Sequence, residues 1–281
     1  MQKIAVEGLT LYFDAEEQEA AGLVREACER SARLLREQWG LAAPEDCRVY
    51  LMTSWLDFVF RSAHWPWKVL LALALPFWVF RVRKLWPLAG GWAQSYGRRR
   101  TVGVKPPRLL QLADRRMGER IFIEEGTLDE KVQRITCHEL THAFTSHLRL
   151  PPWLREGLAM VAVDRCFGRP TVRQETLALL ELSLGKQSTR GDRRLRIEDE
   201  DALITLYARG YWLTRYIEET RPGLLKGLLS RRYRQDELEG KIAAAYGKRP
   251  EEFWSEMDGV LSSHFSTAAW SGGPAGNLSR E

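Results

Sequence analysis

The chain contains 281 residues, of which 44% are hydrophobic and 28% are charged, and this composition excludes a largely disordered or fibrous protein. A chain of this length forms one large domain or two small ones. Its 42 basic and 37 acidic residues give a net charge of +5, which is too small to indicate a nucleic-acid partner. Four cysteines are too few for a disulfide scaffold.

The N-terminal part of the chain predicts strands on either side of a long helix. Ile4 to Phe13 alternates in polarity and predicts a strand or a hairpin. Asp14 to about Trp39 carries apolar residues at helical spacing, Gly40 ends this helix, and Arg48 to Thr53 predicts another strand. The first residues lack the long apolar run and the cleavage site of a signal peptide, so we expect a cytoplasmic protein with free thiols.

Residues 55–97 form an unusual hydrophobic segment that contains six of the eleven tryptophans. Within it, Val69 to Phe80 has twelve residues without a charge, flanked by Lys68 and Arg81. A helix of that length spans about 18 Å, against about 30 Å for the hydrocarbon of a bilayer, so it is too short for an obvious transmembrane helix. Three interpretations stay open: a buried helical hairpin, an interfacial or re-entrant membrane segment, and a true span.

The rest of the chain is predicted to be mostly helical. Thr101 to Val104 and Arg120 to Glu124 have strand character, and the pattern is helical from Leu128 almost to Phe265. A charged connection, Gly191 to Asp201, interrupts it. We therefore expect a strand–helix–strand part of the catalytic domain at 1–54, the hydrophobic insertion at 55–97, the domain core at 98–265 and a flexible tail at 266–281.

The chemistry of the chain is indicated by residues 138–142, which read His-Glu-Leu-Thr-His in a helical pattern with Asp129 as the predicted N-cap. Histidines four residues apart lie on one helix face, so His138 and His142 can reach one metal ion at about 2.0–2.1 Å. Glu139 projects beside them, where it can take a proton from a metal-bound water. The alternative is a pair of core or surface histidines.

A third ligand is predicted on the next helix. The chain restarts a helix at Pro152, a residue suited to the first helical turn, and Glu156 then shares an apolar face with Ala159 and Met160. A buried carboxylate without a partner is costly, and a metal ion would be such a partner. A catalytic zinc has three protein ligands and one open position. The alternative is a glutamate stabilised by the helix dipole.

Two blocks of the sequence resemble a known group of enzymes. His138-Glu139-x-x-His142, followed by Pro152-Trp153-Leu154-x-Glu156-Gly157-Leu158-Ala159, resembles the gluzincin zinc metallopeptidases of the peptidase MA-like superfamily. The segment from Leu206 to Ile217 is similar to the Tyr-x-x-Gly/Ser helix of that group. The resemblance covers about half of the chain, from Arg120 to Phe265, and gives no account of the Trp-rich segment.

The resemblance implies an α+β, zincin-like fold, in which a small N-terminal sheet packs on the active-site helix and a helical C-terminal part closes the cleft. It implies that one zinc ion is bound by His138, His142 and Glu156. It also implies that Glu139 is the general base for hydrolysis of peptide bonds. Peptides or proteins are therefore the expected substrates.

The same resemblance assigns to Tyr207 a hydrogen bond to the oxyanion, with Tyr211, one turn later, as the alternative. The residues alone are equally consistent with two core tyrosines on an amphipathic helix. Asp164 is expected to form a surface ion pair, with support of a zinc histidine as the alternative. The remaining histidines lack ligand spacing and are expected to be structural or exposed: His64, His147 and His264.

The sequence thus predicts a zinc metallopeptidase, acting at a membrane surface if the Trp-rich segment binds lipid. The alternative is a metallopeptidase-like zinc-binding module that binds a protein partner without cleaving it. The presence of Glu139 favours the enzyme, because a binding module needs no base. The expected location is the cytoplasm, peripheral or re-entrant at the cytoplasmic membrane face through Val69 to Phe80, with no nucleic-acid partner.

Overall fold

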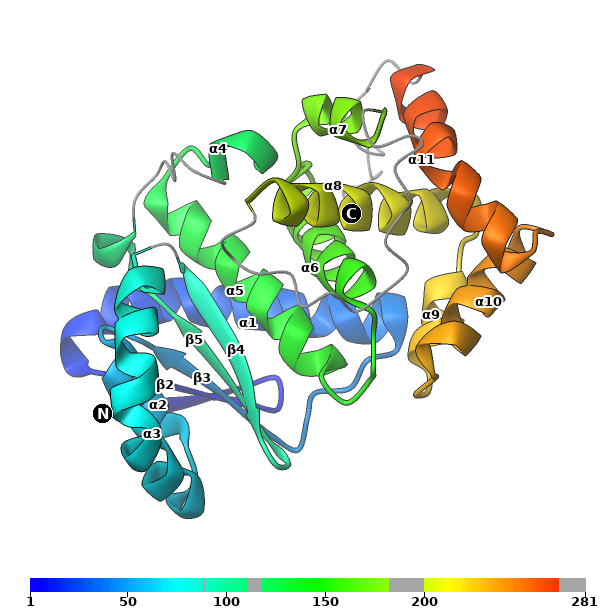
Figure 1. The fold of residues 1–281 in the computed structure, drawn as a ribbon. Helices are drawn as coiled ribbons and strands as arrows, with labels where there is room; N and C mark the ends of the chain where they lie inside the picture. The colour runs from blue at the N-terminus through cyan, green and yellow to red at the C-terminus, as the bar shows by residue number, and fades with distance from the viewer. Residues whose placement is uncertain (88, 111–117, 182–199, 268–281) are drawn as a thin grey trace, which may run out of the picture.

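A five-stranded sheet forms one side of the protein. The computed structural model describes residues 1–87, 89–110, 118–181 and 200–267. The strands lie in the order β1-β2-β3-β5-β4, with β2, β3 and β5 parallel and with β1 and β4 antiparallel to their neighbours at the two edges (Figure 1). Their bounds are β1 Gln2–Val6, β2 Leu9–Phe13, β3 Asp46–Leu51, β4 Gly91–Tyr96 and β5 Arg99–Val104.

Helices cover both faces of this sheet. On one face lie α1 (Gln18–Trp39) and α5 (Leu128–Thr145), which also pack against each other. On the other face lies α2 (Trp55–Ser62). Side chains alternate along β3 accordingly: Val49 belongs to the main core, and Tyr50 packs with Phe58 of α2. Both faces of the central strands are therefore apolar.

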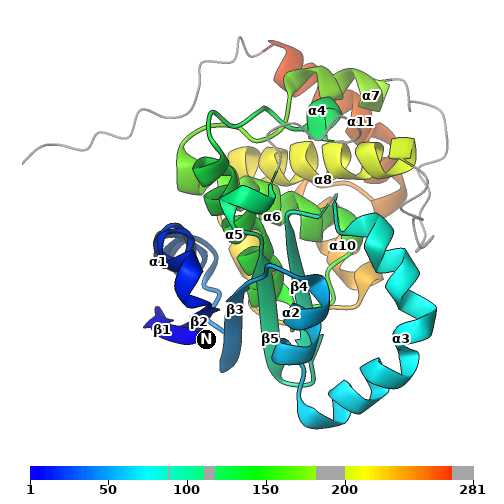
Figure 2. The same ribbon diagram turned by 90° about the vertical axis from the view of Figure 1, so that its left-hand side faces the viewer.

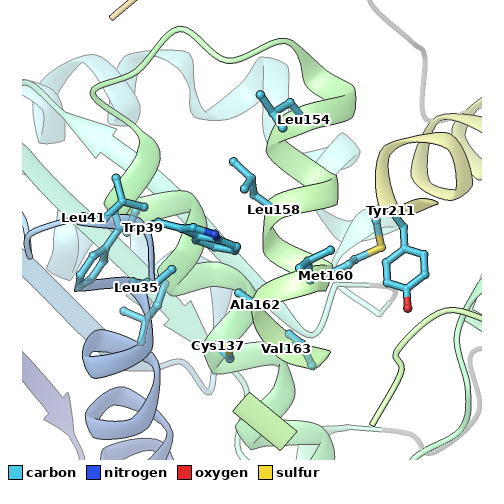
Figure 3. Packing of buried hydrophobic residues seen from close by; sticks show 14 of the residues in the cluster. Leu35, Trp39, Leu41, Cys137, Leu154, Leu158, Met160, Ala162, Val163 and Tyr211 are labelled. Carbon is cyan, nitrogen blue, oxygen red and sulfur yellow. The ribbon is translucent and has the colours of Figure 1, made fainter. Parts of the chain in front are cut away.

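The remaining helices build the second half of the molecule. Helix α6 packs against α1 and α5 on one side and against α8 on the other. Figure 3 shows Trp39 of α1 beside Leu158 and Ala162 of α6 in the buried core. The helix bounds are α3 Trp65–Leu85, α4 Gly118–Ile121, α6 Pro152–Phe167, α7 Leu177–Glu181, α8 Glu200–Thr220, α9 Leu224–Leu229, α10 Gln235–Ala245 and α11 Pro250–Thr267. This arrangement confirms the predicted α+β class.

Two glycines allow α6 and α8 to cross with their backbones in contact. A Cβ atom on Gly157 would lie 2.1 Å from the carbonyl oxygen of Gly210 and 2.2 Å from Oγ1 of Thr214. A Cβ atom on Gly210 would lie 2.3 Å from the carbonyl oxygen of Trp153. Only glycine fits at both positions, so the crossing point of the two helices is set by these residues.

The predicted strand from Arg120 to Glu124 is wrong. Helix α4 ends at Ile121, and Phe122 forms a single antiparallel bridge with Val172. Residues 171–173 pair with this segment through that one bridge, in which Ile123 N donates a hydrogen bond to Thr171 O at 2.9 Å. A longer ladder is not formed, because α5 begins a few residues later.

The Trp-rich segment forms α2 and α3, and residues 91–96 of the expected insertion form strand β4 of the sheet. The interpretation as a buried hairpin is wrong, because Leu73, Phe77 and Phe80 of α3 are exposed. No helix within the described residues combines the length and the apolarity that crossing a bilayer requires. Residues 191–199 of the predicted charged connection lie outside the described residues. So do residues 268–281 of the predicted tail.

Candidate metal centre

Helix α5 presents both histidines of the motif. Thr127 has an extended backbone and its side chain accepts a hydrogen bond from the backbone N–H of Glu130 at 3.2 Å, so Thr127 is the N-cap. The prediction of Asp129 as the cap is wrong, since this residue already lies in the first turn. With the helix regular through Thr145, His138 and His142 lie one turn apart on one face.

Helix α6 brings a carboxylate to the same point. Nε2 of His138 lies 3.0 Å from Nε2 of His142. Oε2 of Glu156 lies 3.5 Å from the first of these nitrogens and 3.3 Å from the second. The structure therefore brings together the three ligands predicted from the sequence.

These distances fit a metal ion. Three ligands at about 2.0–2.1 Å from a tetrahedral zinc ion lie about 3.3 Å from one another. The separations of 3.0, 3.3 and 3.5 Å bracket that value. Two imidazole nitrogens and one carboxylate oxygen form a donor set typical of divalent transition metals. The group is thus compatible with a bound metal ion, whose identity the distances do not select.

The ligand carboxylate is charged and held from several sides. Burial alone would raise the pKa of Glu156, but the hydrogen bonds from His138 and His142 hold that pKa well below its ordinary value. Arg155 Nε also donates to Oε1 of Glu156 at 3.2 Å. Burial alone would lower the pKa of His142, but its hydrogen bond with Glu156 raises that pKa. Sequence reasoning missed Arg155, which follows Leu154 in the motif.

Glu139 lies between the ligands and strand β4. Burial raises the pKa of its carboxyl group above the ordinary value, while the backbone of Ala93 in β4 and the two histidines favour the charged form. A Cβ atom on Gly91 would lie 2.6 Å from Cγ of Glu139, so the strand approaches α5 closely only because this residue is glycine. The double glycine at 90–91 is the sequence signal that reasoning from the motif alone missed.

A cavity of about 390 Å³ opens beside these groups. Glu139, His142 and Glu156 line one side of it, and edge strand β4 lines another. The wall is completed by Ala93, Gln94, Ser95, Ala143, Thr145, Ser146, Leu148, Leu150 and Arg155. A molecule in this cavity would therefore contact Glu139 and two of the three candidate metal ligands, His142 and Glu156.

The two candidate tyrosines lie in different places. Tyr207 lies at the metal centre, where burial and the nearby carboxylates of Glu156 and Glu139 raise the pKa of its hydroxyl. The hydroxyl of Tyr211 donates instead to Oδ2 of Asp164 at 2.6 Å, away from the centre. Figure 3 shows Tyr211 beside Met160 of α6. The Gly157–Gly210 crossing thus positions Tyr207, not Tyr211, beside the ligands.

Asp164 does not form the surface ion pair that we expected. Its carboxylate is buried, and burial raises its pKa from 3.8 to about 6. Its Oδ2 accepts the hydrogen bond of Tyr211, and it does not support His142, whose Nδ1 is buried without a hydrogen-bond partner among the described residues. Cys137 is buried in the core, with its Sγ 3.4 Å from that of Cys166. The other histidines lie outside the centre: His64, His147 and His264.

The chain was compared with protein families, with curated proteins and with solved structures, and none of the three comparisons finds a match. The case for a function therefore rests on the geometry of the site itself.

Proposed function

We propose that the protein is a zinc-dependent metallopeptidase. The observation that carries the proposal is the convergence of His138, His142 and Glu156 next to Glu139 at a cavity. Structural zinc sites use four protein ligands, whereas catalytic sites use three and leave a position for water or substrate. The three ligand atoms here have the separations of such a site, and Glu139 is left free to act as a base.

In this proposal each side chain has a defined task. A zinc ion held by the three ligands would polarise the scissile carbonyl and acidify a water molecule. Glu139 accepts the proton of the attacking water and later passes it to the leaving amine. The neutral hydroxyl of Tyr207 donates a hydrogen bond to the oxygen that becomes negatively charged.

A peptide or protein is the substrate that best suits the cavity. Strand β4 is an edge strand of the sheet and lines the cavity with residues 93–95. An extended peptide can pair with the free backbone groups of such an edge, which would lay its carbonyls across the centre. The proposal also keeps the predicted location at the cytoplasmic face of a membrane. The exposed α3 helix supports contact with a membrane but not the choice of side, and catalysis requires neither.

Metal content and turnover test the proposal together. We expect one zinc ion per chain, its loss in the His142→Ala variant, and cleavage of an unstructured protein such as casein by the wild type. Glu139→Gln should keep the zinc and lose turnover. Tyr207→Phe should keep the zinc and lower kcat by about 10²-fold, as expected for removal of one oxyanion donor.

Two results would contradict the proposal. A chain that takes up no zinc on titration has no metal centre at all. The second result is a protein that binds zinc but cleaves nothing, and whose affinity for a protein partner is the same in the wild type and in the Glu139→Gln variant. Such a protein would be the non-cleaving module considered as the alternative.

A further inference from the structure

Helix α3 carries a continuous apolar face that the described part of the chain leaves uncovered. Val69, Leu73, Phe77 and Phe80 follow one another at helical spacing, and all four are exposed, with Phe77 at 88% and Leu73 at 70%. Trp65 extends this face at the N-terminal end. Figure 2 shows α3 at the margin of the molecule, away from α5 and α6. An exposed apolar surface of this extent marks an interaction site.

Contacts on the opposite, inner face of α3 determine which face of the helix is exposed. Trp78 packs against Trp55 with ring centroids 4.5 Å apart, and Trp67 lies 5.9 Å from Tyr96 of β4. Just beyond the helix, the backbone carbonyl of Trp86 accepts a hydrogen bond from Nζ of Lys105, the residue that follows β5. These aromatic contacts attach the inner face of α3 to α2 and β4. The outer face therefore points away from them.

The chemistry of the helix selects the kind of partner. No acidic residue occurs between Trp65 and Leu85, and the charged residues stand only near the two ends: Lys68, Arg81, Arg83 and Lys84. A protein interface combines its apolar centre with about one hydrogen bond per 100–200 Å². The stretch from Val69 to Phe80 offers one polar side-chain atom, the indole N–H of Trp78, and that residue faces inward.

A lipid surface matches this pattern better than a protein does. Apolar side chains enter the acyl boundary, cations stand at the depth of the phosphates, and tryptophan favours the interface. We propose that α3 lies along the surface of an anionic phospholipid membrane, with Leu73, Phe77 and Phe80 inserted and with Lys68 and Arg83 against the headgroups. The attachment is peripheral, and it holds whether or not the protein is a peptidase.

Co-sedimentation with vesicles tests this inference on the full chain. We expect the wild type to bind vesicles of phosphatidylcholine mixed with phosphatidylglycerol, and to bind phosphatidylcholine alone more weakly. The variant Leu73→Glu/Phe77→Glu should lose at least about tenfold in partition coefficient, because two inserted side chains are replaced by charges. Both positions are exposed, so the variant should keep the circular dichroism and the zinc content of the wild type.

A control variant separates insertion from net charge. Arg231→Gln/Arg234→Gln changes two exposed residues far along the chain, and like the glutamate variant it lowers the net charge from +5 to +3. It should bind vesicles nearly as the wild type does. Wild-type protein that stays in the supernatant, or a glutamate variant that sediments with vesicles as the wild type does, would overturn the inference. So would a lipid-free dimer that the glutamate variant abolishes, since a second copy would then be the partner of α3.

Discussion

Replacing Gly157 by alanine would test whether the α6–α8 crossing positions the metal centre. The new Cβ atom would lie 2.1 Å from the Gly210 carbonyl oxygen, whereas real contacts of this kind stay above 3.0 Å. The Gly210 carbonyl group belongs to the backbone of a helix and cannot rotate away from the new Cβ atom. The two helices must therefore separate by about 1 Å. Glu156 precedes the substituted residue and Tyr207 lies one turn before Gly210, so the separation would pull apart two groups of the centre.

The net cost follows from two opposing terms. Overpacking a core costs about 1–3 kcal/mol, and the upper end applies here because the clash is with backbone. Alanine is better than glycine inside a helix by about 1 kcal/mol, which offsets part of this cost. We expect Gly157→Ala to lose about 2 kcal/mol of unfolding free energy. A displacement of about 1 Å at a catalytic group can also lower turnover by about 10²-fold.

Urea unfolding followed by circular dichroism measures the first effect, and zinc affinity with kcat measures the second. Gly22→Ala is the matched control, because Gly22 lies within α1 and a Cβ atom there would meet nothing within 4 Å. That variant should gain up to about 1 kcal/mol and keep its zinc affinity. If Gly157→Ala were as stable as Gly22→Ala, or bound zinc as the wild type does, the close crossing would not be what positions Glu156.

Two further substitutions address the surroundings of the centre. Gly91→Ala would place a Cβ atom 2.6 Å from Cγ of Glu139, so we expect at least about tenfold lower turnover with unchanged zinc content; full activity would show that the base tolerates displacement. Asp164→Asn tests the buried carboxyl, whose pKa rises from 3.8 to about 6 on folding. Because the folded state binds this proton more tightly, its contribution to stability is lost as pH rises from about 4 to 6, up to about 3 kcal/mol. The stability of the variant relative to the wild type, measured by urea unfolding, should therefore increase over that range, and a pH-independent difference would refute the assignment.

The sequence by itself predicted the group of three side chains that the structure brings together, and Glu139 beside them. Histidines at i and i+4 share a helix face whatever surrounds the helix, so His138 and His142 could be paired from their spacing alone. Glu156 was predicted because a carboxylate on an apolar helix face needs a partner. Long periodic elements such as α1 were also predictable, since helical spacing over many residues reports directly on burial.

Contacts between distant segments were decided only by the tertiary structure. The choice between Tyr207 and Tyr211 depends on where α8 crosses α6, and both tyrosines fit the same helical pattern. The exposure of α3 depends on aromatic partners supplied by α2 and β4, which hydrophobicity along the chain does not identify. Spacing reports on geometry within one element, whereas the place of one element against another is set by packing over the whole chain, as at the glycines where α6 and α8 touch.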